Sequence, residues 1–480
     1  MEIEQYHVHD FRLSAKAAKN PYDGQFTATF KASDGSQIVI PGFYDGDDTW
    51  IIRFSPTQPG EWSYETRSDV SGLDSRRERG ILCVPNASPN IHGLLRVDRS
   101  HPHHFIYDDH TRCFLLGDEC DWLFALDMQD ARRYLDRLQA YGFNQVLMQV
   151  YAHAAPWSEG QPHRLVPPPL YPWGGNNEHP DHTRMNPPFW RHLDEIISYM
   201  HQRGILAHLM IEVHNKGVNW PGRGQGNDDR YWRYVIARYQ AYGNVIWNLS
   251  KEMWKVDDPE YWESRVDLVR QLDAYGHLLT AHDVTLERGD FLADQHHENF
   301  HAHILHERAR RAWPVMNVEY GYEPGPIPTY PVITLSDEMR CRTWEIVTGG
   351  GYPVFYYADT AWDVVDLSLL PEGYRTFHIV RRVVERLLYW EMEPHDNLVD
   401  RGYCLAKPGE AYLIYLPEGG RVHLDVGEVS WKQKRPQATW VDPRTGLEIA
   451  AGPLRSGLNS FMTPSFFGTG DAILVATTPL

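Results

Sequence analysis

Two glutamates, each at the end of a short apolar run, are the residues of this chain best suited to catalysis. Glu252 ends the run that begins at Trp247, and Glu319 ends the run that begins at Pro314. Hydrolysis of a glycoside needs one carboxyl group that protonates the leaving oxygen and a second that attacks the anomeric carbon or activates a water molecule. If the fold brings the two run ends together, the pair indicates a glycosidase.

A recurring pattern predicts the fold that would bring them together. Helical stretches end at Gly142, Gly204, Gly243 and Gly276, and each glycine leads directly into an apolar run. A glycine after a helix accepts the left-handed conformation that ends it, and the apolar run that follows is typical of a strand buried on both faces. The repeats therefore predict a (β/α)8 barrel, in which active sites lie at the C-terminal ends of the strands.

The apolar runs and the helical patterns give the expected elements of this barrel. We expect its strands at about 113–118, 143–150, 205–213, 244–249, 277–283, 291–296, 314–319 and 353–358. Helical patterns lie at 130–140, 187–203, 229–242, 258–275, 299–311 and 336–347. In this arrangement Glu252 follows strand four and Glu319 ends strand seven, so the two carboxyl groups would face each other across the mouth of the barrel.

The two ends of the chain show a different pattern. The first 97 residues carry short alternating runs separated by turn signals such as Asp34-Gly35 and Pro59-Gly60, which is typical of an antiparallel β-sandwich. Similar alternation returns near the C-terminus. The sequence therefore predicts an α/β protein with three domains: an N-terminal β-sandwich (1–97), a catalytic (β/α)8 TIM barrel (98–390) and a C-terminal β-sandwich (391–480).

Composition excludes several classes of partner. The formal charge of −18 leaves no basic surface to neutralise phosphates, so nucleic acids and anionic membranes are not expected to bind. No apolar run approaches the roughly 20 residues of a membrane span, and the first residues lack the basic start and apolar segment of a leader, so we expect a cytoplasmic protein. The five cysteines are scattered without a C-x2-C pair, which favours reduced thiols. A homo-oligomer is compatible with these properties.

Recognition of a sugar needs planar amide and carboxylate groups for its hydroxyls and an aromatic platform for its face. Residues of these types follow the predicted strands, and for each of them a structural role is the alternative. They are Asp118, Asp121, Trp122, Tyr151, His153, His214, Asn215, Trp254, His282, Gln295, His296, Tyr322, Glu323, Tyr357, Asp359 and Trp362. We favour His214 and His296, because a histidine can hydrogen-bond a hydroxyl or the nucleophilic carboxylate.

The segment 155–186 has little helical or strand pattern and is rich in Pro, Gly, His and Asn. Loops of this length inside a compact domain are usually functional. We expect this segment to form a lid or a wall of the site, or else an ordered spacer packed on the sandwich.

Several stretches resemble a known family. Residues Asn244 to Glu252 look like the strand-four motif of clan A glycoside hydrolases, and Glu319 matches the strand-seven nucleophile of that clan. The stretches that resemble the N-terminal β-sandwich of unknown function found ahead of apiosidase-like barrels are Asn20-Pro21-Tyr22, Pro41-Gly42-Phe43-Tyr44-Asp45-Gly46, Phe54-Ser55-Pro56-Thr57 and Pro59-Gly60-Glu61-Trp62. Those that resemble a C-terminal sandwich of the collagen-binding type are Glu393-Pro394-His395 and the stretch from Trp440 to Gly446. The resemblance covers nearly the whole chain.

The resemblance implies that Glu252 is the general acid/base and Glu319 the nucleophile of a retaining double displacement. One residue departs from the family pattern. Clan A enzymes commonly have an asparagine before the acid/base that contacts the 2-hydroxyl of the sugar, whereas this chain has Lys251, which donates hydrogen bonds and accepts none. Lys251 either binds an acidic sugar or is turned outward. Because a cytoplasmic enzyme meets imported oligosaccharides rather than polymers, we expect an exo-type enzyme acting on short oligosaccharides or glycosides.

Two other functions are compatible with these residues. In a non-catalytic carbohydrate-binding protein, the two glutamates would only bind hydroxyl groups. The motif His7-Val8-His9 suggests a metal-dependent amidohydrolase, because an H-x-H at the first strand of a barrel marks that class. Here, however, a whole sandwich pattern separates the motif from the first barrel strand, so we expect no metal ion and no other cofactor.

Overall fold

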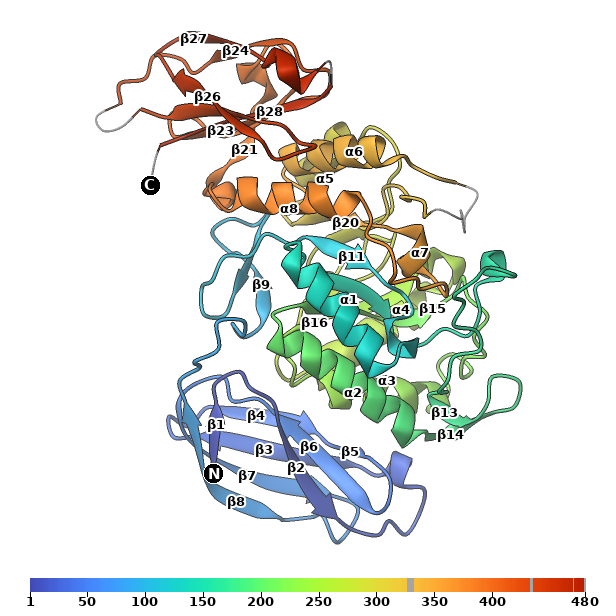
Figure 1. Ribbon diagram of the computed structural model, residues 1–480. Helices are drawn as coiled ribbons and strands as arrows, with labels where there is room; N and C mark the ends of the chain where they lie inside the picture. Colours follow the sequence, from blue (N-terminus) through green and yellow to red (C-terminus); the bar gives the residue numbers. More distant parts are fainter. Residues whose placement is uncertain (326–331, 432–434, 469, 479–480) are drawn as a thin grey trace.

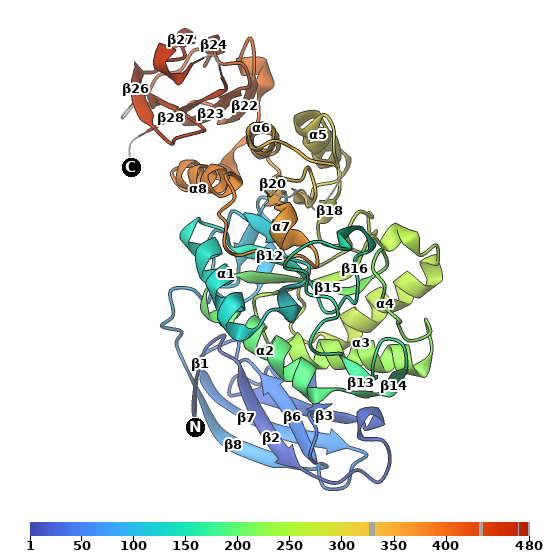
Figure 2. The same cartoon turned by 45° about the vertical axis from the view of Figure 1, so that its right-hand side comes forward.

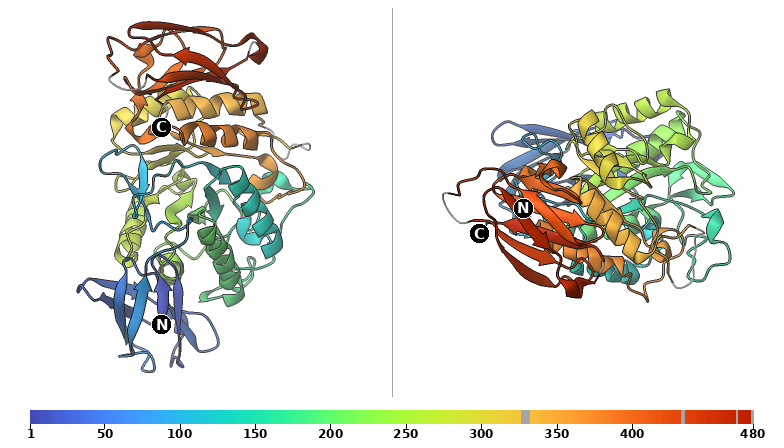
Figure 3. Two further views of the ribbon diagram at one scale, coloured as in Figure 1. Left: turned by 60° about the vertical axis from the view of Figure 1, so that its left-hand side comes forward. Right: turned by 90° about the horizontal axis from the view of Figure 1, so that it is seen from above.

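The computed structural model describes residues 1–325, 332–431, 435–468 and 470–478 (Figure 1). Two β-sandwiches lie at opposite ends of the molecule with the barrel between them, and Figures 2 and 3 show the same order from other sides. This arrangement confirms the predicted fold class. No helix among these residues is both long and apolar enough to cross a membrane.

Two sheets form the N-terminal sandwich. Their strands are β1 (Glu2–Glu4), β8 (Arg77–Val84), β7 (Gly60–Ser68), β3 (Phe26–Ala32) and β4 (Gln37–Pro41) in one sheet, and β2 (His9–Ser14), β6 (Thr49–Phe54) and β5 (Phe43–Tyr44) in the other, with a short turn η1 (Pro21–Asp23) before β3. Alternate residues of β3 are buried, and Phe30 stacks on Phe54 across the sandwich with ring centroids 3.8 Å apart. The pairs are antiparallel as predicted, except that β1 runs parallel to β8.

Eight parallel strands form the central sheet. They are β11 (Gly117–Glu119), β12 (Gln145–Gln149), β15 (Leu206–Val213), β16 (Val245–Lys251), β17 (Leu279–Thr280), β18 (Leu292–Asp294), β19 (Val315–Asn317) and β20 (Tyr352–Phe355). The hydrogen-bonded order is β17, β16, β15, β12, β11, β20, β19, β18, and a parallel bridge between His282 and Ala293 brings the two edges together. The sheet is therefore a nearly closed barrel, and each strand overlaps its predicted range.

Helices cover the outside of the barrel (Figure 1). They are α1 (Met128–Ala140), α2 (Pro187–Gln202), α3 (Gly226–Tyr239), α4 (Pro259–Leu272), α5 (Phe300–Arg310), α6 (Ser336–Thr348) and α8 (Gly373–Val384), with the short turns η2 (Leu123–Ala125), η3 (Pro156–Ser158), η4 (Met253–Lys255) and α7 (Ala358–Ala361) in the loops. The first six overlap the predicted helices, whereas α8 is not among them. The segment 281–291, which is described throughout, contains no helix, so the β/α repeat is interrupted between β17 and β18.

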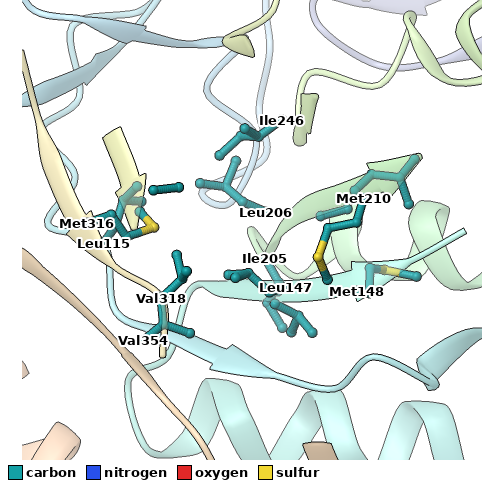
Figure 4. Packing of buried hydrophobic residues seen from close by; sticks show 14 of the residues in the cluster. Leu115, Leu147, Met148, Ile205, Leu206, Met210, Ile246, Met316, Val318 and Val354 are labelled. Atoms are coloured by element: carbon teal, nitrogen blue, oxygen red, sulfur yellow. The ribbon is translucent and has the colours of Figure 1, made fainter. Parts of the chain in front are cut away.

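Apolar side chains fill the barrel. All eight residues of β15 are buried, as expected for a strand with helices on one side and the barrel interior on the other. Figure 4 shows side chains from several strands packed in one cluster, among them Leu147, Leu206, Ile246, Met316 and Val354. This core holds the strand ends at fixed distances from one another.

Three of the four glycines that end helices have the predicted conformation. Gly142, Gly204 and Gly276 have positive φ angles of 87°, 66° and 70°. Gly243 does not, and a Cβ atom there would lie 2.8 Å from the carbonyl oxygen of Gly93. Glycine is therefore required at that position by the close approach of another backbone segment rather than by a left-handed turn.

A buried ion network joins the N-terminal sandwich to the barrel. Asp194 of α2 receives hydrogen bonds from Arg53 of β6 and from Arg238 of α3, the shortest at 2.8 Å for each arginine. Arg238 also lies 2.9 Å from Asp45 of the sandwich, and Arg53 pairs with Asp10 of β2 at 2.7 Å. Because these arginines are buried, the network fixes how the sandwich sits on the helices.

A hairpin of β9 (Leu95–Val97) and β10 (Phe105–Tyr107) leads from the first sandwich to the barrel. The C-terminal sandwich contains β21 (Glu393–Pro394), β22 (Tyr403–Lys407), β23 (Ala411–Leu416), β28 (Ala472–Thr477), β25 (Gln437–Val441) and β26 (Glu448–Pro453) in one sheet, β24 (Arg421–Asp425) and β27 (Leu458–Met462) in the other, and the short turns η5 (Tyr389–Glu391), η6 (Asp396–Leu398) and η7 (Ser465–Phe467). Arg340 of α6 binds the buried Asp471 at 2.9 Å, which ties this sandwich to the barrel.

Candidate active site

Buried charged side chains meet at the C-terminal ends of the barrel strands. Lys251, the last residue of β16, is 1% exposed, and its ammonium group donates to Glu119 of β11 and, at 3.3 Å, to the hydroxyl of Tyr356 after β20. The same nitrogen lies 3.6 Å from a carboxylate oxygen of Asp121 and of Glu319. One cation is thus surrounded by three carboxyl groups. The alternative that Lys251 is turned outward is wrong, because its side chain is enclosed by the mouth of the barrel.

Electrostatics keep this lysine charged. Although burial opposes the charge, the surrounding carboxylates raise the pKa of Lys251 above its usual value. Burial raises the pKa of Glu119, and the ammonium group of Lys251 opposes that rise. Lys251 therefore stays positively charged, and the negative charge is distributed over the acids that surround it.

Glu319 follows β19 and is 5% exposed. Its Oε1 accepts a hydrogen bond from the hydroxyl of Tyr322, and its Oε2 lies 3.7 Å from Nε2 of His282. Burial lowers the pKa of His282 well below its usual value, so the ring is neutral. The hydroxyl of Tyr322 thus holds one oxygen of Glu319, while the neutral imidazole of His282 and the ammonium group of Lys251 lie near the other, at 3.7 and 3.6 Å.

Glu252 directly follows β16 and lies nearer the solvent, with 15% of its side chain exposed. Its backbone is left-handed, with φ 48°, a conformation that costs free energy in a residue with a side chain. Nδ2 of Asn215 donates to its Oε1 at 2.5 Å, and Nζ of Lys255 lies 3.2 Å from its Oε2. The turn at Glu252 gives its carboxyl group a direction different from that of Lys251, the preceding residue.

A second buried lysine lies beside the cluster. The side chain of Lys216, which follows β15, is fully buried, and its Nζ lies 3.5 Å from Oδ2 of Asp121. Burial lowers the pKa of Lys216, and the carboxylate of Asp121 opposes that effect. Asp121 therefore stands between two lysines, Lys216 and Lys251.

Several buried polar atoms at the mouth lack protein partners. Oε2 of Glu319, both ring nitrogens of His282 and Oδ1 of Asn215 have no hydrogen-bond partner among the residues that the structure describes. Buried polar groups in proteins are nearly always hydrogen-bonded. Their concentration around Glu252 and Glu319 indicates the place where a polar ligand or water binds.

Aromatic side chains line the same region. Tyr322 and Tyr356 meet edge to face with ring centroids 5.1 Å apart, and Trp362 lies 5.7 Å from Tyr322. Trp254 follows Glu252 and is 56% exposed, with Nζ of Lys255 4.5 Å from its ring centroid. One aromatic cluster therefore lies beside Glu319, and an exposed indole lies two residues after Glu252.

Asp118 and Glu119, neighbours in β11, have different partners. Asp118 accepts hydrogen bonds from Tyr134 of α1 at 2.8 Å and from Tyr374 of α8 at 2.7 Å, so its carboxyl group lies on the helix side of β11. Burial raises the pKa of Asp118 to about 7. Successive residues of a strand point to opposite faces, and Glu119 therefore reaches Lys251. The prediction that Asp118 contacts substrate disagrees with this geometry, and Glu119 was missed.

Three candidates on the loops after β19 and β20 also lie away from Lys251. The carboxylate of Glu323 accepts the backbone N–H groups of Glu372 at 2.8 Å and Gly373 at 3.0 Å, so it caps the start of α8. Tyr357 follows Tyr356 and forms a parallel bridge with Glu323. Asp359 packs beside Gly325, and burial raises the pKa of this aspartate to about 6.

The favoured histidines do not contact Glu319. Nε2 of His214 lies 3.0 Å from Glu212, and His296 stacks on His303 with ring centroids 3.6 Å apart. His282, another of the candidates, approaches Glu319 instead, with its Nε2 3.7 Å from Oε2. A residue can follow a barrel strand and still turn toward the helices, and the sequence contains no signal for the direction of such a turn.

The remaining candidates lie around the edge of the mouth. The hydroxyl of Tyr151 hydrogen-bonds Nδ1 of His153 at 3.0 Å, and Gln295 contacts His297 at 3.4 Å. Trp122 is fully buried next to Phe124. None of these contacts joins Glu252 or Glu319 directly.

The long segment after β12 contacts both the mouth and the sandwich. It contains a hairpin of β13 (Trp173–Gly175) and β14 (Pro180–Met185). Arg164 pairs with Asp363 of the loop after β20 at 3.0 Å, whereas Thr183 accepts a hydrogen bond from Asn20 at 2.7 Å. Its first part therefore forms a wall beside the mouth, and its second part packs on the N-terminal sandwich.

Comparisons with known proteins agree with this architecture. Residues 100–366 match the apiosidase-like catalytic domain, residues 2–69 match a domain of unknown function (DUF5060), and residues 395–477 match a collagen-binding type of domain described for a collagenase. No curated protein matches the chain.

Two crystal structures from Bacteroides vulgatus share the fold. One is of a protein considered to be a glycoside hydrolase, 22% identical, with all of both chains covered and a TM-score of 0.84. The other is of a glycoside hydrolase of family 5, 17% identical, covering 82% of this chain and 95% of that chain, with a TM-score of 0.63.

The apiosidase-like match spans more than half of the chain and includes both Glu252 and Glu319. It is flanked by matches to the two domains that the sequence resembles, in the same order. The match supports glycosidase activity in general. The chain belongs to the apiosidase-like family.

Proposed function

We propose that the chain is a retaining exo-type glycosidase that hydrolyses short oligosaccharides or glycosides. The observation that carries the proposal is the position of Glu252 and Glu319 after β16 and β19, beside buried polar atoms that have no hydrogen-bond partner among the described residues. Hydroxyl groups of a sugar would supply those partners. The reaction is assigned to a catalytic domain of residues 98–390, between sandwich domains of residues 1–97 and 391–480.

The two glutamates have different surroundings, which supports different roles. Glu319 is nearly enclosed, and its Oε2 lies 3.6 Å from the ammonium group of Lys251, a position that suits the group that attacks the anomeric carbon. Glu252 is more exposed, with 15% of its side chain accessible, so a leaving group can depart on its side. We therefore assign the nucleophile to Glu319 and the general acid/base to Glu252.

The reaction has two steps. In the first, a carboxylate oxygen of Glu319 bonds to the anomeric carbon, the bond to the leaving oxygen breaks, and Glu252 gives its proton to that oxygen. In the second, the ionised Glu252 takes a proton from water, the water oxygen bonds to the anomeric carbon, and Glu319 is released. Two displacements at one carbon give a product with the configuration of the substrate.

Binding at the end of a sugar chain is supported by the wall beside the mouth. Backbone N–H of Leu165 donates to the carbonyl of Asp363 at 2.6 Å, and Gly217 donates to Ala154 at 3.0 Å. The segment after β12 is thereby joined to the loops after β15 and β20. Because this wall closes one side of the mouth, a sugar chain would enter with its end rather than lie across the mouth.

The test is hydrolysis of a panel of 4-nitrophenyl glycosides that includes hexopyranosides, uronides and pentofuranosides. We expect the wild type to cleave at least one of them and Glu319→Ala to cleave none. A wild type that binds a sugar in calorimetry but cleaves no glycoside, or a Glu319→Gln variant with full turnover, would instead support a non-catalytic carbohydrate-binding protein.

A further inference from the structure

Lys251 has its donors engaged by the protein itself. An ammonium group carries three N–H donors. Two of its contacts are the carboxyl group of Glu119 and, at 3.3 Å, the hydroxyl of Tyr356, and the remaining direction faces Asp121 and Glu319, each at 3.6 Å. A substrate carboxylate would have to displace one of these groups.

Acidic side chains outnumber basic ones around this lysine. The acids that face Lys251 or Glu319 are Glu119, Asp121 and Asp283, and Glu252 faces Lys216 and Asp283. The basic groups are Lys216, His282 and His297, and the hydroxyls are those of Tyr322 and Tyr356. Burial lowers the pKa of both histidines, so Lys216 and Lys251 are the two cations of the set. An acidic sugar would therefore meet more acidic side chains than cations, although burial raises the pKa of two of these acids, Glu119 and Asp283.

We propose that Lys251 is a positioning residue that places its positive charge beside Glu319 and holds that side chain in place, that Glu119 holds Lys251 in turn, and that the cation does not serve to bind an acidic sugar. This inference rests on the proposed role of Glu319 as the nucleophile. It also explains the burial of Glu119, a residue that has no part in the chemical steps. Through the contacts of Lys251 with Glu119 and Glu319, the ends of three strands, β11, β16 and β19, are connected.

The first test measures kcat/KM against pH with the neutral 4-nitrophenyl glycoside that the wild type cleaves fastest. Lys251→Met removes the cation near Glu319, so the acid limb of the profile should move to higher pH by about 1 to 3 units. Lys251→Arg retains a cation and should keep the limb near its wild-type position. Glu119→Gln retains the cation and an amide oxygen that can still accept its hydrogen bond, so this variant should not move the limb upward.

A double variant separates this effect from simple loss of stability. Lys251→Met leaves Glu119 buried without its partner, which should lower the unfolding temperature. Lys251→Met combined with Glu119→Gln removes both groups' charges, so it should recover much of the lost stability while the acid limb stays shifted. Lys255→Met is the matched control, because Lys255 pairs with Glu252 instead, at 3.2 Å, and its removal should leave the acid limb in place.

The second test compares substrates. A 4-nitrophenyl uronide and the neutral glycoside of the same stereochemistry should lose kcat/KM by similar factors in Lys251→Met. A loss at least tenfold greater for the uronide would assign Lys251 to substrate binding and overturn the proposal. So would a Lys251→Met profile that is lower at every pH but keeps the wild-type acid limb. Turnover that survives in Glu319→Ala would contradict the proposed function itself. That outcome is distinct from any change in the pH profiles of the Lys251 variants.

Discussion

Asn215 donates a hydrogen bond to Oε1 of Glu252, so a residue that follows β15 orients the carboxyl group that follows β16. Glu252 has a left-handed backbone, and this contact helps to fix its side chain there. The other end of the amide, Oδ1 of Asn215, has no hydrogen-bond partner within the described part of the chain. One amide can thus hold the acid and accept a hydrogen bond from a substrate hydroxyl at the same time.

Asn215→Ala should therefore act like a weakened form of an acid deletion. We expect kcat/KM to fall about 10- to 100-fold on glycosides with poor leaving groups and to fall less on 2,4-dinitrophenyl glycosides, which need little protonation. Asn219→Ala is the control, because Asn219 is exposed and contacts Asn177. Losses of equal size on both kinds of substrate would show that Asn215 does not act through Glu252.

The two glutamates should differ in the same test. Glu319→Ala should abolish turnover of every glycoside, since no covalent intermediate can form. Glu252→Ala should abolish turnover of unactivated glycosides and spare cleavage of those with good leaving groups. Kinetics over a series of leaving groups measures the difference, and a flat response in Glu252→Ala would remove the acid assignment.

The barrel could be predicted from the sequence because its signals are local. Gly142, Gly204 and Gly276 adopt the left-handed conformation that ends a helix, and the strands that follow them are buried as their apolar composition predicts. The exception, Gly243, depends on contact with Gly93, a residue far away in the sequence. A requirement for glycine that arises from such a contact leaves no local signal.

The site was harder to predict, because a shift of one position along a strand moves a side chain to the opposite face. Asp118 and Glu119 are neighbours with similar side chains, yet one hydrogen-bonds tyrosines of two helices and the other binds Lys251. The period-2 alternation of β11 would have separated them if the strand ends had been known. Glu323 posed a different problem, since its role as a cap of α8 depends on a helix that was not predicted.

Asp118 should also give the protein a pH-dependent stability. Burial raises its pKa to about 7 in the folded state, above the unfolded value of about 3.9. Its contribution to stability is therefore complete below about pH 4 and is lost as the pH rises through 7, by up to about 4 kcal/mol. Asp118→Asn cannot lose a proton, so its unfolding temperature relative to wild type should rise between pH 4 and pH 8. Scanning calorimetry measures this difference, and a constant difference over that range would contradict the prediction.

Asp194 should be important for stability. Asp194→Ala would leave the buried guanidinium groups of Arg53 and Arg238 without their shared partner, and removal of one member of a buried ion pair costs about 3 to 5 kcal/mol. Asp136→Ala is the matched control, because Asp136 pairs with Arg203 at 3.0 Å while both side chains are largely exposed, and such pairs contribute about 1 kcal/mol or less. Equal shifts in unfolding temperature for the two variants would mean that the network does not stabilise the fold.

The central claim is that Glu319 forms a covalent bond to the sugar, and mass spectrometry of a trapped intermediate tests it most directly. In Glu252→Ala the second step lacks its general base, so a 2,4-dinitrophenyl glycoside of the preferred sugar should load the enzyme faster than water releases it. After quenching in acid and digestion, the account predicts that the peptide containing Glu319 gains the mass of one glycosyl residue and that Glu252→Ala combined with Glu319→Gln gains none. A glycosyl group on another residue, or release of a product of inverted configuration without any labelled peptide, would contradict it.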